Sequence, residues 1–220
     1  MRRRETDPIA NVKKVVVTGG PCAGKTTVIN YLRGAMPEYI VTVPEVATTL
    51  LGGGYPMPGV DLEWSQEWQN SFQDAVFHVQ QSAEGAAVLV AQQRGGGVVV
   101  ADRGLMDGAA YFKGNKGEFA DRYGLDLPVV MGRYDTVVHL ESIAVRSRHL
   151  YNALKDNNPT RFQSYESSLA LEYGVLEAWD GHPNRIIVNE HSLDDRLLAV
   201  EGIVRAVQGM GPVVTDAEML

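Results

Sequence analysis

Residues 19–26 read Gly19-Gly20-Pro21-Cys22-Ala23-Gly24-Lys25-Thr26. This stretch has a glycine, four residues and then Gly-Lys-Thr, which is the pattern of a phosphate-binding loop. Glycines let the backbone turn so that successive N–H groups point inward at phosphate oxygens, and a following helix adds its positive end. We therefore expect this loop to bind the phosphates of a nucleotide, with Thr27, the next residue, at its edge.

The context of the loop matches the motif. Residues 14–18 read Lys-Val-Val-Val-Thr, an apolar β-branched run that predicts a strand. Residues 25–33 have helical spacing and are followed by Gly34 and Pro37, which end helices. The alternative is a glycine-rich turn that carries a lysine by chance, and the order of strand, loop and helix argues against it.

Three side chains have the chemistry to hold a nucleotide with Mg²⁺. We expect Lys25 to reach the β- and γ-phosphates and the Thr26 hydroxyl to hold Mg²⁺. Asp102 follows the apolar run at 98–101, at the end of a predicted buried strand, and we expect it to orient Mg²⁺ through water. The alternative for Asp102 is an ordinary turn residue at a strand end.

The rest of the chain alternates short apolar runs with longer helix-like segments. The further apolar runs lie at 39–43, 98–101, 135–140 and 185–188. The longest helical pattern spans 63–93, and Ser192 is placed to cap the last helix, which we expect to end near Gln208. This alternation predicts an α/β fold of three layers, with a doubly wound sheet of about five parallel strands.

The composition of the chain limits the classes of protein to which it can belong. With 220 residues, 45% of them apolar, the chain can bury a full core, and we expect one domain over 1–210 with flexible tails at 1–12 and 210–220. The net charge of −7 argues against binding to DNA, which needs a surplus of Lys and Arg. The single cysteine, Cys22, is either a small filler or an oxidisable thiol, and it fits a reducing, cytoplasmic compartment. No apolar stretch has the length of a membrane span.

Two charged residues follow predicted strands and face the phosphate loop. Glu45 comes after the strand at 39–43, so in a doubly wound sheet it shares a cleft with Lys25. Its carboxylate can orient or deprotonate an attacking hydroxyl, or it can cap the helix that follows. Arg103 suits a phosphate of the nucleotide or acceptor, or else a salt bridge with Glu45 or Asp107.

The segment 142–173 carries three arginines, and we expect it to be a lid-like helical cover. Phosphoryl transfer spreads negative charge over the phosphate oxygens, and an arginine supplied by a closing segment stabilises that charge. We expect Arg146 and Arg161, ahead of Arg148, to reach the phosphates. The alternative is a solvated helix face on which the arginines pair with nearby acids, namely Asp156, Glu166 and Glu172.

Several short motifs carry a resemblance to a known family. They are Val17-Thr18-Gly19-Gly20-Pro21 with Gly24-Lys25-Thr26-Thr27, Pro44-Glu45-Val46-Ala47, Ala101-Asp102-Arg103-Gly104 and Gly181-His182-Pro183. With them the chain resembles the P-loop family that includes the ribosylnicotinamide kinase domain of bacterial NAD-salvage proteins and the nucleotide-binding domain of a eukaryotic translocation-defect protein, often labelled AAA-type ATPase. The resemblance implies a P-loop NTPase fold of the nucleoside-kinase kind, with Glu45 as the acceptor-side carboxylate. Gly104 departs from the Ser or Tyr of the wider kinase pattern.

Two functions fit these residues. The first is a kinase that transfers the γ-phosphoryl group of ATP or GTP to a small, nucleoside-like acceptor bound near residues 52–73, with Trp68, Gln69 and Gln73 as candidate lining. The second is a nucleotide-dependent switch or NTPase with a protein or lipid partner. A Ras-like GTPase is disfavoured because Asp102 does not begin an Asp-x-x-Gly motif, and a full AAA+ motor because little chain follows the last strand. The helix at 63–93 offers a face for a homodimer.

Overall fold

The computed structural model describes residues 11–156 and 164–211, and in them one five-stranded sheet forms the centre of the molecule. Its strands are β1 (Val12–Thr18), β2 (Ile40–Val43), β3 (Gly97–Asp102), β4 (Thr136–Leu140) and β5 (Arg185–Val188). They lie in the order β2-β3-β1-β4-β5, and every pair is parallel. This confirms the predicted α/β class with a parallel sheet.

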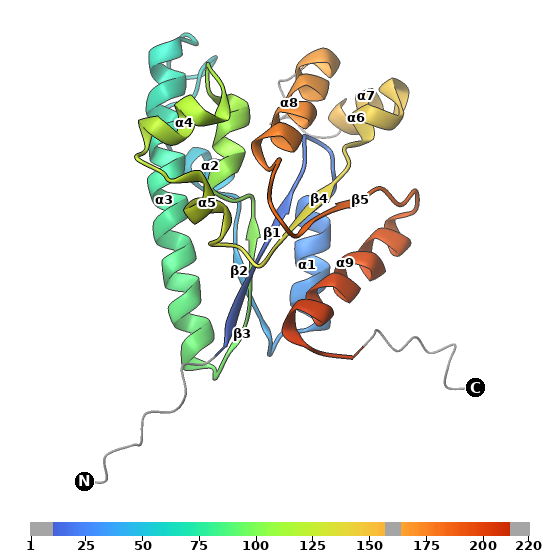
Figure 1. The fold of residues 1–220 in the computed structure, drawn as a ribbon. Coiled ribbons are helices and arrows are strands. Elements are labelled where there is room, and N and C mark those ends of the chain that lie inside the picture. Colours follow the sequence, from blue (N-terminus) through green and yellow to red (C-terminus); the bar gives the residue numbers. More distant parts are fainter. Residues whose placement is uncertain (1–10, 157–163, 212–220) are drawn as a thin grey trace.

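Helices cover both faces of the sheet (Figure 1). They are α1 (Lys25–Ala35), α2 (Val46–Gly52), α3 (Gln66–Gln93), the 3₁₀ helix η1 (Leu105–Tyr111), α4 (Lys116–Arg122), α5 (Leu127–Met131), α6 (Ile143–Arg146), α7 (Arg148–Asp156), α8 (Tyr165–Ala178) and α9 (Leu193–Gln208). Helices α1 and α9 pack on one face, and α3, η1 and α8 on the other. No helix in the described ranges is long and apolar enough to cross a membrane.

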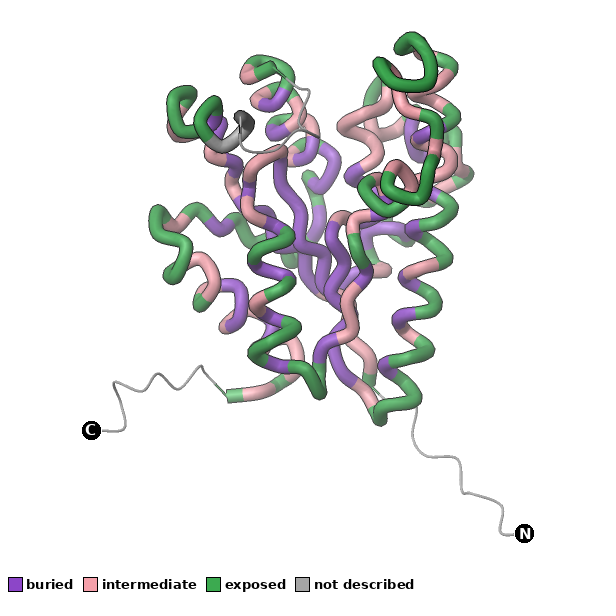
Figure 2. The backbone as a smooth tube through the Cα atoms, turned by 180° about the vertical axis from the view of Figure 1, so that it is seen from behind, coloured by how far each residue is buried: buried purple, intermediate pink, exposed green. Residues whose placement is uncertain are grey.

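The alternation of side chains along β1 explains the two cores. Val15 and Val17 point to the core under α1 and α9, whereas Val16 points to the core under η1 and α8. All three are fully buried. Because a parallel sheet covered on both faces has no solvated side, its strands are continuous apolar runs. Figure 2 shows this as a buried centre within helices whose outer surfaces are exposed.

The order of the strands fixes where a ligand can bind. The chain passes from β1 to β2 and β3 on one side of it, and then crosses to β4 on the other. In an open α/β sheet, the crevice at such a switch point lies beyond the carboxyl ends of the strands. The phosphate loop follows β1 at this edge, and α6, α7 and α8 stand over the same end of the sheet (Figure 1).

Some boundaries differ from the sequence-based expectations. The segment after Lys113 contains α4, a helix that lies outside the elements expected from the sequence, and the Asn115 side chain caps its start by accepting from the N–H groups of Gly117 and Glu118. Ser192 caps α9 as predicted, because its hydroxyl accepts from Asp195 N at 3.0 Å. The tails predicted at 1–12 and 210–220 lie largely outside the described residues.

Candidate active site

The phosphate loop is shaped by residues with positive φ. Gly19, Cys22 and Gly24 have φ of 131°, 62° and 86°. A Cβ on Gly19 would lie 2.1 Å from the carbonyl oxygen of Leu140, so only glycine fits there. Gly24 precedes α1, and no side chain caps that helix. The N–H groups at the start of α1 therefore keep their capacity to bind an anion.

Lys25 lies over the loop that precedes it. Its side chain is buried, and Nζ donates to the carbonyl oxygens of Gly19 at 2.9 Å and Gly20 at 3.0 Å. Burial, reinforced by the positive charge of Arg103, lowers the pKa of Lys25 to about 8. The carboxylates of Asp102, Glu45 and Asp107 offset part of this lowering, and a polyphosphate bound in the loop adds further negative charge beside the ammonium.

Asp102 and Thr26 meet beside the loop, as expected of groups that hold a metal. Thr26 Oγ1 lies 3.4 Å from Asp102 Oδ2. Burial raises the pKa of Asp102 to about 6. Within the described chain, Asp102 Oδ1 is buried without a hydrogen-bond partner. An orphaned carboxylate oxygen next to a hydroxyl fits Mg²⁺ or its bound water.

No cluster of three or more His, Cys, Asp or Glu in the described residues could hold a metal by itself. This agrees with the usual behaviour of Mg²⁺, which keeps several waters and binds through one or two protein groups together with substrate phosphates. The residues present therefore fit a metal ion that arrives with a nucleotide.

Glu45 and Arg103 form an ion pair at the same edge of the sheet. Arg103 Nε donates to Glu45 Oε1 at 2.8 Å, and Arg103 Nη1 donates to Asp107 Oδ1 at 3.2 Å. Although burial favours the neutral carboxyl, Arg103 and Lys25 lower the pKa of Glu45 to about 2. Glu45 precedes α2, but its side chain makes no capping hydrogen bond there and instead accepts from Thr48 Oγ1 at 2.5 Å.

Asp107 has a larger role in the site than sequence reasoning assigned to it. This buried carboxylate accepts from Thr18 Oγ1 at 2.5 Å and from Trp179 Nε1 at 2.9 Å, in addition to Arg103. It joins the end of β1 to η1 and to the residue after α8. The sequence signal that could have indicated this role is the position of Asp107, four residues after Arg103, which allows the two side chains to pair.

A hollow of about 440 Å³ lies beside the ion pair. It is lined by the start of α3, the end of η1 and α8, through Trp64, Gln66, Gln69, Ala110, Tyr111, Phe112, Lys113, Ser167, Ala170 and Leu171. The guanidinium carbon of Arg103 lies 5.8 Å from the centre of the Tyr111 ring, so this ring connects the hollow to the ion pair. Of the predicted acceptor residues, Gln69 lines the hollow, whereas Trp68 stacks on Phe72 at 5.0 Å.

The arginines of the 142–173 segment have separate surroundings. Arg146 Nε donates to Glu141 at 2.7 Å, and its Nη1 donates to the Glu190 carbonyl at 2.6 Å. Arg148 is exposed and pairs with Glu166 at 2.7 Å, as the alternative of a solvated face predicted. Arg161 lies outside the described residues.

Sequence reasoning missed Arg196, which contacts the phosphate loop from α9. Its Nη1 donates to the Ala23 carbonyl oxygen at 2.8 Å. It also donates to Glu190, the same carbonyl that Arg146 contacts, at 3.0 Å. Nothing in the local sequence marks Arg196, since it reads as one basic residue on a mixed helix.

The geometry agrees with the comparison with known families. The family model described as AAA domain matches residues 14–196. The chain belongs to the AAA domain family. The matched region of this AAA domain runs from β1 into α9 and includes the phosphate loop, Glu45 and Asp102. No curated protein matches the chain.

Membership places this AAA domain among P-loop NTPases, which bind nucleotides and generally use Mg²⁺. The five-stranded parallel sheet with flanking helices agrees with that fold. The match is to the family as a whole, so the resemblance to ribosylnicotinamide kinase and translocation-defect domains stays a prediction.

Proposed function

We propose that this AAA domain binds ATP or GTP with Mg²⁺ and transfers the γ-phosphoryl group to a small acceptor. The observation that carries the proposal is the Glu45–Arg103 ion pair, at 2.8 Å, between the phosphate loop and the hollow at Tyr111. A carboxylate and a guanidinium fixed at this position can orient an attacking hydroxyl and stabilise negative charge on the transferred group.

On the nucleotide side, the loop amides and Lys25 bind the triphosphate, and Thr26 and Asp102 hold the metal. Mg²⁺, when bound, neutralises charge that develops on the β- and γ-phosphates. Lys25 adds a positive charge that is already desolvated, because its side chain is buried. A preorganised charge of this kind stabilises a transition state without reorganisation at the moment of reaction.

On the acceptor side, Glu45 orients the attacking hydroxyl. A carboxylate with a pKa of about 2 is a weak base at neutral pH, so its main contribution is to accept a hydrogen bond. This suffices for phosphoryl transfer, whose loose transition state needs positioning and electrostatic stabilisation more than proton removal. Arg103 holds Glu45 and presents a fixed positive charge to the transferred group.

The hollow suits a nucleoside-like acceptor. Its volume of about 440 Å³ lies in the range usual for small-molecule sites, roughly 300–1,000 Å³. Trp64 and Tyr111 offer aromatic surface for a planar ring, and Gln66 and Gln69 offer amide donors and acceptors for its edge. In this proposal Arg146 and Arg161 are the arginines of the lid segment 142–173. When the lid closes, Arg146 exchanges its contact with Glu141 for a contact with a phosphate.

The second candidate is an NTPase or switch, which the family match favours, since AAA domains are nucleotide-using modules. In that case Glu45 orients water instead of an acceptor hydroxyl. The hollow at Tyr111 then binds part of a protein or lipid partner, and hydrolysis changes the position of η1 or α8.

The distinguishing experiment measures ADP or GDP release over a panel of nucleosides and sugars. We expect one acceptor class to raise turnover well above the acceptor-free rate in wild-type protein. Glu45→Gln should abolish this stimulation and spare nucleotide binding, and the exposed Glu38→Gln is the matched control that should change neither. Turnover that no small acceptor stimulates, but a protein or lipid vesicle does, supports the switch instead.

A further inference from the structure

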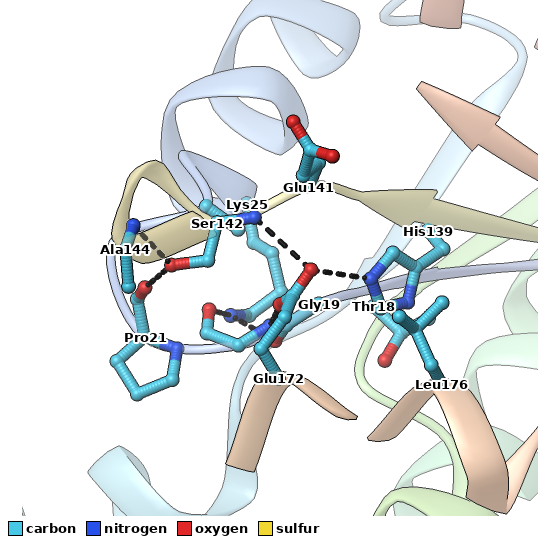
Figure 3. A network of polar contacts seen from close by, with 12 residues as sticks. Thr18, Gly19, Pro21, Lys25, His139, Glu141, Ser142, Ala144, Glu172 and Leu176 are labelled. Atoms are coloured by element: carbon cyan, nitrogen blue, oxygen red, sulfur yellow. Dashed lines mark hydrogen bonds and ion pairs between the residues drawn. The ribbon is translucent and has the colours of Figure 1, made fainter. Parts of the chain in front are cut away.

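Glu172, on α8, is a fully buried carboxylate that contacts the phosphate loop. Its Oε2 accepts from the backbone N–H of Gly20 at 2.6 Å. Its Oε1 accepts from the backbone N–H of Ser142 at 3.2 Å and lies 2.9 Å from His139 Nε2. Figure 3 shows Glu172 next to His139, with the loop residues Gly19 and Pro21 close by. Sequence reasoning treated Glu172 as one acid on a solvated face, and its burial corrects that alternative.

The three donors around Glu172 keep it ionised. Burial alone would raise the pKa of this carboxyl, but the hydrogen bonds from His139, Gly20 and Ser142 lower it. Because an ionised carboxylate only accepts, His139 must donate from Nε2. Charge-assisted hydrogen bonds of this kind are short and strong, and they fix the geometry of the groups that donate them.

A second contact binds the same turn of the loop. The Ser142 hydroxyl donates to the carbonyl oxygen of Pro21. Ser142 precedes α6 and Glu172 lies in α8, so both ends of the arginine-bearing segment are attached to the first turn of the loop. The conformation of the first residues of the phosphate loop therefore depends partly on residues more than a hundred positions away in sequence.

These contacts also decide which amides are left for a phosphate. The N–H of Gly20 is used by Glu172, and Pro21 has no N–H to give. An anion in the loop is therefore directed to the later amides and to the first turn of α1, where Lys25 and Thr26 lie.

We propose that Glu172 is a positioning residue for nucleotide binding: held by His139, it fixes the first turn of the phosphate loop and keeps phosphate away from Gly20 N. The inference rests on the proposed use of this loop for triphosphate, and concerns no other step. Glu172 acts on the phosphate loop and not on the base of the nucleotide. We therefore expect the same effect on the binding of ATP and of inorganic triphosphate.

The test is Glu172→Gln. A glutamine offers one acceptor and one donor where three N–H groups converge, so at least one N–H faces another. We expect the dissociation constants for Mg²⁺–ATP and for inorganic triphosphate, measured by titration calorimetry, to rise by about tenfold or more and by a similar factor. An unchanged constant for both probes would overturn the proposal.

The matched control is Glu201→Gln on α9. Glu201 is also buried and accepts from Tyr31 at 2.6 Å and Arg205 at 2.8 Å, but it does not contact the loop. The Glu201→Gln substitution should lower the melting temperature and leave both dissociation constants unchanged. Equal weakening in Glu201→Gln and Glu172→Gln would show a general effect of core damage and would contradict positioning.

A second variant covers the case in which Glu172→Gln does not fold. His139→Leu removes one donor and leaves Glu172 bonded to Gly20 and Ser142, so it perturbs the carboxylate less. We expect a several-fold rise in both dissociation constants, and no rise would overturn the proposal. If wild-type protein binds neither Mg²⁺–ATP nor inorganic triphosphate, the result contradicts the proposed function as well as this inference.

Discussion

Gln80 donates a hydrogen bond from Nε2 to the backbone carbonyl oxygen of Arg103 at 2.9 Å. Arg103 has φ of 73°, a left-handed conformation that costs a residue with a side chain about 1–2 kcal/mol. Gln80 is buried on α3, so the longest helix of the protein holds the strained end of β3. In this conformation the guanidinium of Arg103 meets Glu45.

Replacement of Gln80 by leucine should loosen Arg103. We expect kcat to fall by about tenfold with little change in the KM for nucleotide, because Arg103 contacts the phosphate loop through one long hydrogen bond, 3.3 Å to the Gly19 carbonyl oxygen. An orphaned buried carbonyl should also lower the free energy of unfolding by about 1–3 kcal/mol. Steady-state kinetics against the exposed neighbour Gln81→Leu, which should behave like wild type, checks this. A rise in KM alone would contradict it.

Arg103→Lys should impair turnover although it keeps the charge. A lysine has no planar fork, so it cannot contact Glu45, Asp107 and the Gly19 carbonyl together as Arg103 does. We expect kcat/KM to fall by about 100-fold, or about 2.7 kcal/mol in transition-state stabilisation. Arg122→Lys, in a surface pair with Asp74, is the control. Activity retained in Arg103→Lys would mean that charge alone suffices.

The raised pKa of Asp102 predicts a pH dependence for metal binding. The carboxyl is ionised above about pH 6 and protonated below, and only the ionised form binds Mg²⁺. Mg²⁺-dependent nucleotide affinity should therefore be highest between about pH 6 and pH 8, the pKa of Lys25, and should fall by up to about tenfold for each pH unit below 6. ATP protonates in the same range, so the informative comparison is Asp102→Asn, which should show a weaker dependence. An equal dependence of nucleotide affinity on pH in both proteins would show that Asp102 does not hold the metal.

Gly19→Ala should damage the loop by sterics alone. An added Cβ would lie 2.1 Å from the Leu140 carbonyl, at a φ of 131°. We expect a clear drop in melting temperature and loss of nucleotide binding. Gly34→Ala makes the same chemical change in α1, where nothing lies within 4 Å, and should stabilise by up to about 1 kcal/mol. Binding by Gly19→Ala at wild-type affinity would contradict the geometry of the loop.

The parts of the site that follow from chain neighbours and strand ends are predictable from sequence. The phosphate loop is recognised by its spacing, and Asp102 by the apolar strand before it. The pairing of Arg103 with Glu45 is also foreseeable, because each follows a parallel strand and the carboxyl ends of parallel strands meet at one edge. Local pattern and topology together are sufficient for these residues.

The contacts made by helices packed over that edge are not predictable in this way. Glu172 and Gly20 are 152 positions apart, and only the packing of α8 brings them together. Gln80 reads as one polar residue on a long helix, and which face of α3 it occupies depends on the twist of the sheet below. The direction of Arg146 likewise depends on the loop after β5, whose path the sequence does not give.

The proposed function depends above all on the binding of a triphosphate by residues 19–26 through Lys25. The most direct test is the melting temperature of wild-type protein and Lys25→Ala with and without Mg²⁺–ATP. At a ligand concentration of 100 times Kd, binding should stabilise wild type by about 2.7 kcal/mol and raise its melting temperature by several degrees. We expect no rise for Lys25→Ala, whose unliganded melting temperature should stay close to that of wild type. An equal rise in both proteins would show that the nucleotide binds elsewhere and would contradict binding through Lys25.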